Sequence, residues 1–433
     1  MSTLKSLSEV HRSIVIPKNA SFLRKMLAFT GPGYLVAVGY MDPGNWATDL
    51  AGGSAFGYTL LFVILLSSIF AMFLQHLTVK LGVVTGRDLA QLCRENFPLW
   101  VNRFLWAMAE IMIIACDLAE VIGTAIALEL LFGIPLAIGV VITAVDVLLL
   151  LFLQKKGFRW LEALVMVLIG TVVVCFALEM FFSQPAVAPL LAGFVPVTQL
   201  FTNQEMLLIA VGILGATVMP HNLYLHSAIV QTRAHETTQK GKKEAIKFGT
   251  LDSTIALSIA FLVNASILIL SAATFHARGY GNVAEIDQAY QLLAPLLGVG
   301  AASVLFAVAL LASGQNSTIT ATLAGQVILE GFLKVRLKPW VRRLTTRLLA
   351  IIPAVIIAII FGGSGLSRLL IFSQVVLSLQ LPFAIWPLVY FTSRKKHMGV
   401  FANRAWMKGV VFTIAGVITG LNVWLLTRIV TGA

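Results

Sequence analysis

Two polar interruptions stand inside otherwise apolar stretches of the sequence. Asp-Pro-Gly-Asn at 42–45 follows the apolar residues 35–38, and Met-Pro-His at 219–221 follows a second apolar lead. A proline removes a backbone donor and clashes with the preceding turn, so each interruption predicts a broken helix. In the first, we expect the helix to stop near Met41 or Asp42 and to restart after Asn45. A carboxylate at membrane depth is costly, so its presence indicates function.

The groups at the two breaks form a ligand set for a divalent cation if the breaks face each other. The first half of each broken helix ends in unsatisfied carbonyls and the negative end of its dipole, which favours a cation. The further ligands are the Asp42 carboxylate, the Asn45 amide oxygen, a carbonyl near Ala216 and the Met219 thioether. Oxygens alone suit Mg²⁺ or Ca²⁺, whereas a sulfur ligand favours Mn²⁺, Fe²⁺ and heavier ions such as Cd²⁺.

Three carboxyl groups lie in one further apolar stretch, at Glu110, Asp117 and Glu120. Their spacings of seven and three residues place them on one stripe of a helix. Three acids facing lipid would be prohibitive, so the stripe must face the protein interior or water. Two interpretations stay open and are compatible: a path for protons, and structural salt bridges to arginines. Arg347, about a turn inside a later span, is a candidate partner.

The composition requires membrane-spanning helices to position these groups. The chain has 433 residues, 58% hydrophobic and 12% charged, with a mean hydropathy of +0.91. No soluble globular protein buries that much apolar side chain, so we expect an all-α polytopic membrane protein. Windows of about 20 apolar residues predict eleven transmembrane helices. They are 28–52 (interrupted), 58–80, 104–131, 135–154, 160–183, 205–232 (interrupted), 249–274, 299–328, 346–362, 369–392 and 407–430.

The basic residues predict how the chain is oriented. Only Arg278, Arg368 and Arg428 fall on one face of the predicted topology, which leaves 28 of the 31 lysines and arginines on the other. By the positive-inside rule, the N-terminus is cytoplasmic and the C-terminus external. The net charge of +12 is thus a topology signal, and no nucleic-acid partner is expected. The three cysteines have no paired spacing and predict neither a zinc site nor a disulfide framework.

The two breaks also predict an internal repeat. They lie five spans apart, and interrupted segments in corresponding positions are typical of an inverted five-plus-five repeat with its site at the repeat interface. The expected division is a cytoplasmic N-terminal tail (1–25), a first repeat of helices 1–5 (26–183), a second repeat of helices 6–10 (184–392) and an additional helix 11 (393–433).

The motifs at 42–45 and 219–221 are similar to the paired signatures of the Nramp family of proton-coupled divalent metal transporters. The similarity continues in family order from about residue 25 to 430. It includes the segments 82–86, 117–120, 224–227, 313–318 and 373–378. The resemblance implies a LeuT-type inverted five-plus-five repeat with helices 1 and 6 broken.

The resemblance also implies roles for individual residues. Asp42, Asn45, Met219 and the carbonyl of Ala216 match the family's metal ligands, and Gln374 and Ser317 match residues that join them as the site occludes. The residues that match the polar network of proton movement are His221, Glu110, Asp117, Glu120 and Arg347, with Asp42 as a shared proton acceptor. Relatives that carry Mg²⁺ lack the methionine, so Met219 favours Mn²⁺ and Fe²⁺.

The function expected is import of Mn²⁺ or Fe²⁺, with Cd²⁺ and Co²⁺ as further cargo, driven by protons moving in the same direction. Alternating access would come from hinges near Gly39, Gly44 and Gly215. The protein would be a multi-pass protein of a bacterial plasma membrane, a monomer and not an enzyme, with no resident cofactor. Its partners would be the metal ion, protons and the lipid bilayer.

Two alternatives remain at this point. The same scaffold could carry an amino acid with Na⁺, holding the substrate carboxylate at a half-helix N-terminus. Alternatively, Asp42 could act with Asp117 or His221 as general acid and base of an intramembrane hydrolase. The hydrolase lacks a convincing nucleophile or histidine metal motif.

Overall fold

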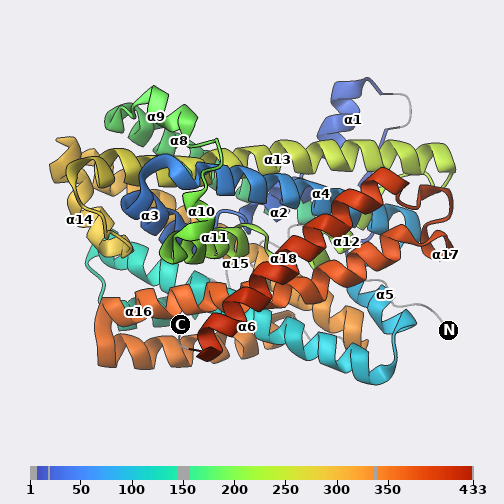
Figure 1. Ribbon diagram of the computed structural model, residues 1–433. Helices are drawn as coiled ribbons and strands as arrows, with labels where there is room; N and C mark the ends of the chain where they lie inside the picture. Colours follow the sequence, from blue (N-terminus) through green and yellow to red (C-terminus); the bar gives the residue numbers. More distant parts are fainter. Residues whose placement is uncertain (1–6, 18–19, 145–156, 336–338, 432–433) are drawn as a thin grey trace.

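Long helices make up most of the described chain, which the computed structural model gives as residues 7–17, 20–144, 157–335 and 339–431. The helices expected to cross the membrane are α2 Pro32–Val38, α3 Pro43–Phe56, α4 Leu61–Thr85, α6 Leu99–Phe132, α8 Phe158–Ser183, α11 Gln204–Thr217, α12 Pro220–Ile229, α13 Gln239–Thr274, α15 Ala301–Leu333, α16 Pro339–Ser393 and α18 Ala405–Thr431. In Figure 1, α13 runs along one side of the bundle and α6 with α16 along the other.

Shorter elements connect these helices. They are β1 Ile14–Val15, α1 Phe22–Phe29, η1 Gly57–Leu60, α5 Leu89–Asn96, α9 Val187–Ala192, α10 Gln199–Thr202, η2 Val230–Thr232, β2 Arg233–Ala234, η3 His276–Arg278, α14 Ile286–Leu297, α17 Lys395–Met398 and η4 Gly399–Phe401. The strands β1 and β2 pair in parallel, which ties the N-terminal segment to the chain just after α12.

Nine helical segments of the described chain are long and apolar enough to cross a membrane. One of them, Pro43–Thr85, covers α3 together with α4, which the sequence assigns to two spans. The expected fourth span, 135–154, is helical over 136–144 and then leaves the described residues. The ninth and tenth spans are both present within α16, separated by a non-helical Gly362 with φ 61°. The count of eleven stays a prediction.

The first helix break is present, but it begins earlier than predicted. α2 ends at Val38, and α3 begins at Pro43 with Asp42 as its N-cap. The prediction of a helix that reaches Met41 and restarts after Asn45 was therefore wrong. A proline is favourable at the first position of a helix, because the amide hydrogen it lacks would have no helical partner there. Asn45 consequently lies in the first turn of α3.

The second break has the same local design. α11 ends at Thr217, Met219 is the N-cap of α12, and Pro220 is its first residue. α11 packs against α3, and α12 packs against α2. Each half-helix of one break therefore lies beside a half-helix of the other, as an inverted repeat requires.

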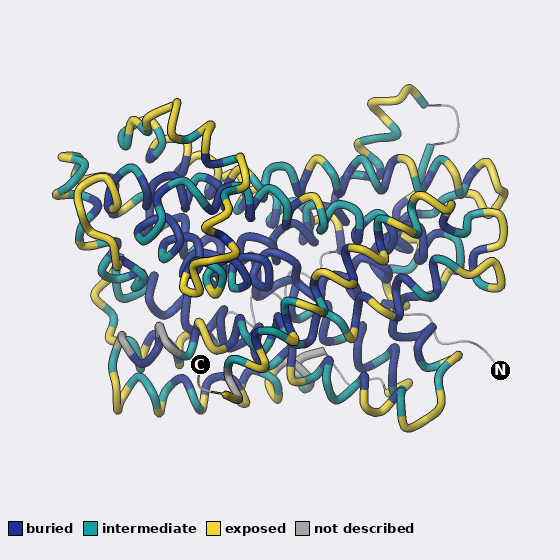
Figure 2. Tube along the Cα trace, in the orientation of Figure 1, coloured by how far each residue is buried: buried dark blue, intermediate teal, exposed yellow. Residues whose placement is uncertain are grey.

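Aromatic packing fixes α3 beside the break. Trp46 is fully buried, and its ring lies 5.0 Å from both Phe176 of α8 and Phe306 of α15, centroid to centroid. Figure 2 shows the buried residues gathered in the middle of the bundle, with exposed residues at its ends and outer faces. The two breaks thus belong to the buried middle of the bundle.

Candidate metal site between the two helix breaks

The first break presents two oxygens that the protein leaves without a partner. Asp42 Oδ1 accepts hydrogen bonds from the backbone amide of Asn45 (3.1 Å) and from Asn45 Nδ2 (2.6 Å). Asp42 Oδ2 and Asn45 Oδ1 are buried and have no hydrogen-bond partner among the described residues. Because buried polar atoms are normally satisfied, these two oxygens fit a cation.

A third such oxygen comes from α16. A Cβ atom built on Gly44 would lie 1.9 Å from Gln374 Nε2, so this amide lies directly against the first break. Gln374 Nε2 donates to Ser373 Oγ at 3.2 Å, whereas Gln374 Oε1 is buried without a partner among the described residues. The structure therefore brings Gln374 to the first break, while its part in binding metal stays a prediction.

The second break supplies a carbonyl and a sulfur. Ala216 and Met219 are fully buried. The residue four positions after Ala216 is Pro220, which has no amide hydrogen, so the Ala216 carbonyl loses its usual helical donor. No group of three or more His, Cys, Asp or Glu side chains gathers in the described part of the chain. A cation held here would thus meet one carboxylate and otherwise neutral ligands.

His221 and Asn222 border the other end of the first break. A Cβ atom on Gly39 would lie 2.3 Å from Asn222 Nδ2 and 3.0 Å from His221 Nε2. The polar atoms of both side chains are buried without partners in the described structure. The sequence alone indicated no role for Asn222. Its position two residues after Pro220, at a helix break, was the signal that could have found it.

The glycines predicted as hinges are points of close approach. The close approaches of Gly39 and Gly44 are those just described. Gly215 of α11 lies so near α16 that a Cβ atom would come within 2.6 Å of Ser378. A side chain at any of these three positions would have to push a neighbour away. Close packing of this kind is where glycine is needed.

The acids of α6 form ion pairs with Arg347. Arg347 lies 3.4 Å from Glu120 Oε2 and 3.8 Å from Asp117 Oδ1. Ser317 donates to Glu120 Oε1 at 3.0 Å, so its hydroxyl is bonded within this cluster. Glu110 accepts a hydrogen bond from Trp106 at 3.0 Å. The geometry supports the salt-bridge interpretation for Asp117 and Glu120, while their part in proton movement stays a prediction.

A polar layer that the sequence did not reveal lies beside the breaks. Gln75 donates to the Tyr40 hydroxyl at 2.7 Å, and its Oε1 lies 2.8 Å from His226 Nδ1. Asn264 donates to the Tyr40 carbonyl at 2.8 Å. Since Tyr40 lies between α2 and α3, this layer ties the first break to α4, α12 and α13. Polar residues inside apolar spans, such as Gln75 and His226, were the available signal.

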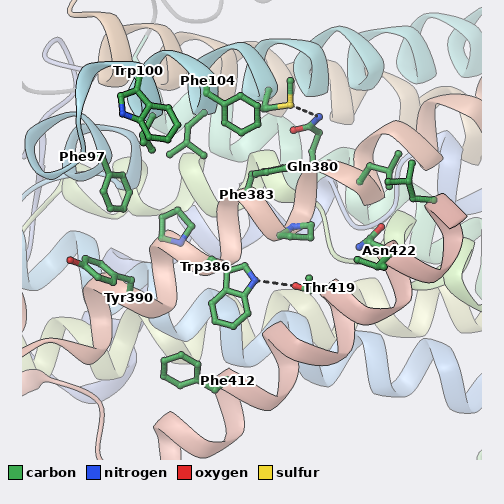
Figure 3. A pocket seen from close by; sticks show the side chains of 18 residues that line it. Phe97, Trp100, Phe104, Gln380, Phe383, Trp386, Tyr390, Phe412, Thr419 and Asn422 are labelled. Carbon is green, nitrogen blue, oxygen red and sulfur yellow. Dashed lines mark hydrogen bonds between the residues drawn. The ribbon is translucent and has the colours of Figure 1, made fainter.

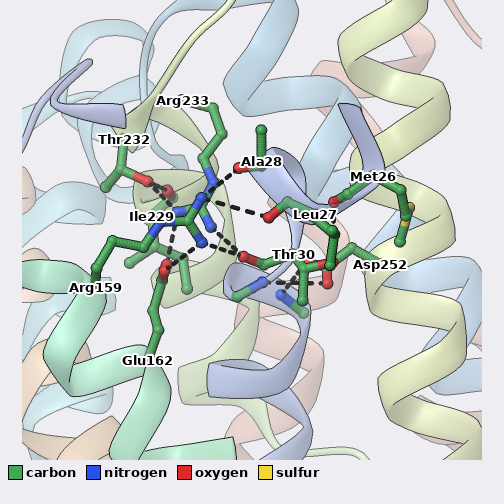
Figure 4. A network of polar contacts seen from close by, with 12 residues as sticks. Met26, Leu27, Ala28, Thr30, Arg159, Glu162, Ile229, Thr232, Arg233 and Asp252 are labelled. Atoms are coloured by element: carbon green, nitrogen blue, oxygen red, sulfur yellow. Dashed lines mark hydrogen bonds and ion pairs between the residues drawn. The ribbon is translucent and has the colours of Figure 1, made fainter. Parts of the chain in front are cut away.

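A second polar cluster, also missed, holds the start of α2 (Figure 4). We call it the clamp; it consists of Arg159 and Glu162 of α8, Arg233 of β2 and Asp252 of α13. Arg233 donates to Glu162 Oε1 (2.6 Å) and to the Thr30 carbonyl (2.6 Å).

The other members of the clamp bind the same segment. Arg159 donates to Glu162 Oε2 at 3.1 Å and to the Thr30 carbonyl at 2.7 Å. Asp252 accepts from the amides of Gly31 (3.3 Å) and Gly33 (2.6 Å). Burial lowers the pKa of Arg233, and the carboxylate of Glu162 opposes that shift. The clamp thus fixes the first half of the broken helix to three other elements.

This architecture of paired broken helices occurs in known transporters. Mhp1, a nucleobase-cation-symport-1 family transporter, has the same fold with a TM-score of 0.60 and 17% identity over 85% of this chain and 79% of that chain. The crystallised manganese transporter of Eremococcus coleocola matches with a TM-score of 0.91 and 43% identity over 96% of this chain and 90% of its own. The predicted LeuT-type fold is thereby confirmed.

Proteins of similar sequence show to which family of transporters the chain belongs. A protein from Nostoc sp. called divalent metal cation transporter MntH is 62% identical over 99% of this chain and 97% of its own length. One with the same name from Bradyrhizobium diazoefficiens is 59% identical over 99% of this chain and 96% of its own. The family model described as natural resistance-associated macrophage protein-like matches residues 33–428. The chain therefore belongs to the Nramp family, as the motifs indicated, and is a multi-pass membrane protein.

Proposed function

We propose that this protein imports divalent transition metal ions, Mn²⁺ or Fe²⁺, into the cytoplasm by proton-coupled alternating access. The observation that carries the proposal is the set of three buried, unpartnered oxygens on Asp42, Asn45 and Gln374 at one break. The Ala216 carbonyl and the Met219 thioether belong to the other break, where both residues are buried and the half-helices pack against those of the first break. A single carboxylate among neutral ligands suits a cargo that must be released as well as bound.

Met219 sets the proposed choice among metals. Its sulfur is a soft ligand, which adds affinity for Mn²⁺, Fe²⁺, Co²⁺ and Cd²⁺ and little for Mg²⁺ or Ca²⁺. The names of the relatives, a divalent metal cation transporter and a manganese transporter, agree with this cargo. No resident cofactor is needed, because the metal is the substrate.

Asp42 is proposed to serve both metal and proton. When metal binds, the carboxylate is a ligand; when metal leaves, the same oxygen accepts a proton, so the two cations compete for one site. The proton's further route is assigned to His221 beside the break and to Glu110, Asp117, Glu120 and Arg347 on α6 and α16. The ion pairs of Arg347 with Asp117 and Glu120 support a linked polar route there.

Release to the cytoplasm is proposed to require opening of the clamp. The basic residues predict that the N-terminus is cytoplasmic, which puts the clamp at the cytoplasmic end of α2. With the clamp formed, α2 is held to α8, β2 and α13. Its opening would let α2 swing away, with Gly39, Gly44 and Gly215 as hinges, while Ser317 and Gln374 close the opposite side.

One chain suffices for this mechanism. Both breaks belong to the same chain, so the proposed working unit is a monomer of eleven helices, divided into repeats 26–183 and 184–392 with an added helix in 393–433. The same geometry disfavours a Na⁺-driven amino-acid symporter. A substrate carboxylate would need a half-helix N-terminus. Asp42 already caps the N-terminus of α3 with its own carboxylate, and the N-cap of α12 is Met219, a thioether.

The test is a flux assay on proteoliposomes with Mn²⁺, Fe²⁺, Mg²⁺ and Ca²⁺ at several pH values. We expect uptake of Mn²⁺ and Fe²⁺ that increases with an inward proton gradient and is lost in an Asp42→Ala variant. The matched control is Asp287→Asn, which removes a carboxylate on α14. Persistent Mn²⁺ uptake by Asp42→Ala would contradict the ligand assignment, and competition by amino acids would favour the symporter.

A further inference from the structure

A large apolar groove lies on the outer side of the bundle, away from the two breaks. It occupies about 1000 Å³ between α6, α16 and α18. Seven of its 18 lining residues are aromatic (Figure 3), and they include Phe97, Trp100, Phe104, Phe383, Trp386 and Phe412. Trp100 is 73% exposed and Phe412 44% exposed. Since the three helices cross the membrane, these exposed rings open the groove toward the lipid.

The groove has the length of one leaflet. Its lining residues run from Leu379 to Tyr390 on α16 and from Phe412 to Leu426 on α18. At 1.5 Å per residue, these stretches are about 17 and about 21 Å long. Half of the hydrocarbon core of a bilayer measures about 15 Å. One extended acyl chain of one leaflet therefore fits along it.

One end of the groove carries an aromatic cluster. The rings of Phe97 and Tyr390 lie 5.8 Å apart, and those of Trp386 and Phe412 lie 5.9 Å apart. Tryptophan and tyrosine favour the depth of the lipid headgroups, where one part of the ring is apolar and another is wet. This cluster therefore marks the headgroup end, and the end near Asn422 lies deeper in the bilayer.

Three basic side chains stand one turn from these rings. Arg394 lies over the Tyr390 ring, 4.1 Å from its centroid. Arg103 follows Trp100 by three residues and Lys408 precedes Phe412 by four, so each lies on the same face of its helix as that ring. Among the described residues, none of the three forms an ion pair with an acidic side chain.

Of charged residues, the two C-terminal helices that line the groove carry basic ones only. Residues 331–433 contain 13 lysines and arginines and no aspartate or glutamate. Neither α16 nor α18 therefore offers a carboxylate to neutralise the three cations. A ligand with a negative head and an apolar tail complements both parts of the surface.

We propose that this groove binds one acyl chain of an anionic phospholipid, with the lipid phosphate bound by Arg103, Arg394 and Lys408. The site goes beyond the proposed transport function, because it shares no residue with the metal ligands. The lipid would bridge α6, which carries the ion-paired acids, and α16, which carries Gln374. It would thereby restrain α16, which the proposed closure through Gln374 must move.

The test uses the full-length protein reconstituted with a phosphatidylglycerol that bears a photoreactive group on one acyl chain. After illumination, mass spectrometry of peptides locates the captured lipid. We expect capture on 97–108, 379–390 and 412–426, and much weaker capture of the matching phosphatidylcholine, which has the same tail and phosphate but no net charge. Equal capture of both lipids would overturn the anionic site, and so would capture of neither lipid on these three peptides.

Variants of the basic residues test the binding of the lipid headgroup, and variants of the groove test the binding of the acyl chain; each set has its own control. Arg394→Gln and Lys408→Gln should each reduce phosphatidylglycerol capture about fivefold, the factor for about 1 kcal/mol per basic residue near the lipid surface. The control Arg428→Gln removes a charge that also stacks on a ring of α18, 5.4 Å from Trp424, and should change nothing.

Val423→Trp should fill the groove and block capture, whereas Val417→Trp, exposed on the same helix but outside the groove, should not. The proposal would be refuted if Arg428→Gln lost as much capture as Arg394→Gln and Lys408→Gln, or if Val417→Trp blocked capture as Val423→Trp does.

Discussion

The burial of the clamp residues predicts how much free energy is lost when the ion pair between Arg233 and Glu162 is broken. Arg233 and Glu162 are both fully buried at the side chain and 2.6 Å apart. A Glu162→Gln variant leaves the Arg233 guanidinium buried beside a neutral group. Breaking a buried ion pair by removing one partner costs about 3–5 kcal/mol. Because Arg233 keeps its bond to the Thr30 carbonyl, we expect the lower value, about 3 kcal/mol. This cost destabilises the clamped state and leaves the unclamped state unchanged.

This free energy predicts a shift of about 100-fold toward the unclamped state. The assay is alkylation of a single reporter cysteine at Ala37→Cys, buried in α2, after Cys93, Cys116 and Cys175 are replaced by alanine. If opening is fast compared with alkylation, the labelling rate follows the fraction of open protein. The Glu162→Gln variant should therefore be labelled about 100-fold faster than its parent.

The matched control is the double variant Glu162→Gln with Arg233→Gln. It replaces the ion pair with two neutral amides but also removes the Arg233 bond to the Thr30 carbonyl. Labelling should therefore be slower than in Glu162→Gln and faster than in the parent. If Glu162→Gln leaves labelling unchanged, the clamp does not hold α2. If the double variant is labelled as fast as Glu162→Gln, the loss arises from something other than the unpaired charge.

Three further predictions concern the site itself. Met219→Ala should keep most Mn²⁺ uptake but weaken discrimination against Ca²⁺ and Mg²⁺ in competition assays; unchanged selectivity would contradict the soft-ligand argument. Gly44→Ala should raise the KM for Mn²⁺, because its Cβ displaces the Gln374 amide. If this is the cause, Gln374→Ala should raise the KM equally, and the double variant should raise it no further. Arg347→Gln leaves the acids of α6 without their cation, so it should alter the pH dependence of uptake more than the KM for Mn²⁺.

The sequence predicts the helix breaks well because their causes are local. Proline, glycine and short polar residues within an apolar run interrupt a helix wherever they occur. The exact start of α3 was misjudged because Pro43 was treated only as a breaker, although proline also favours the first turn of a new helix. The positions of Asp42 and Met219 as N-caps follow from that single fact.

The sequence predicts poorly what depends on contacts between distant elements. Arg233 and Glu162 are separated by 71 positions and Asn264 and Tyr40 by 224, so no periodicity or spacing connects them. Arg233 was counted only as one of many basic residues that set topology. The role expected for Gln374 came from the family resemblance, and its place beside Gly44 depends on the contact between α16 and α3. The lipid-facing groove likewise arises only when α6, α16 and α18 come together.

The most direct test of the metal site is the X-ray absorption spectrum of Mn²⁺ bound to the purified protein. The ligand set proposed here predicts a shell of oxygen neighbours with one sulfur neighbour, and it predicts that Met219→Ala loses the sulfur while the oxygens remain. A purely oxygen shell in the parent protein, or a sulfur signal that survives in Met219→Ala, would contradict a metal held between the two broken helices by Asp42 and Met219.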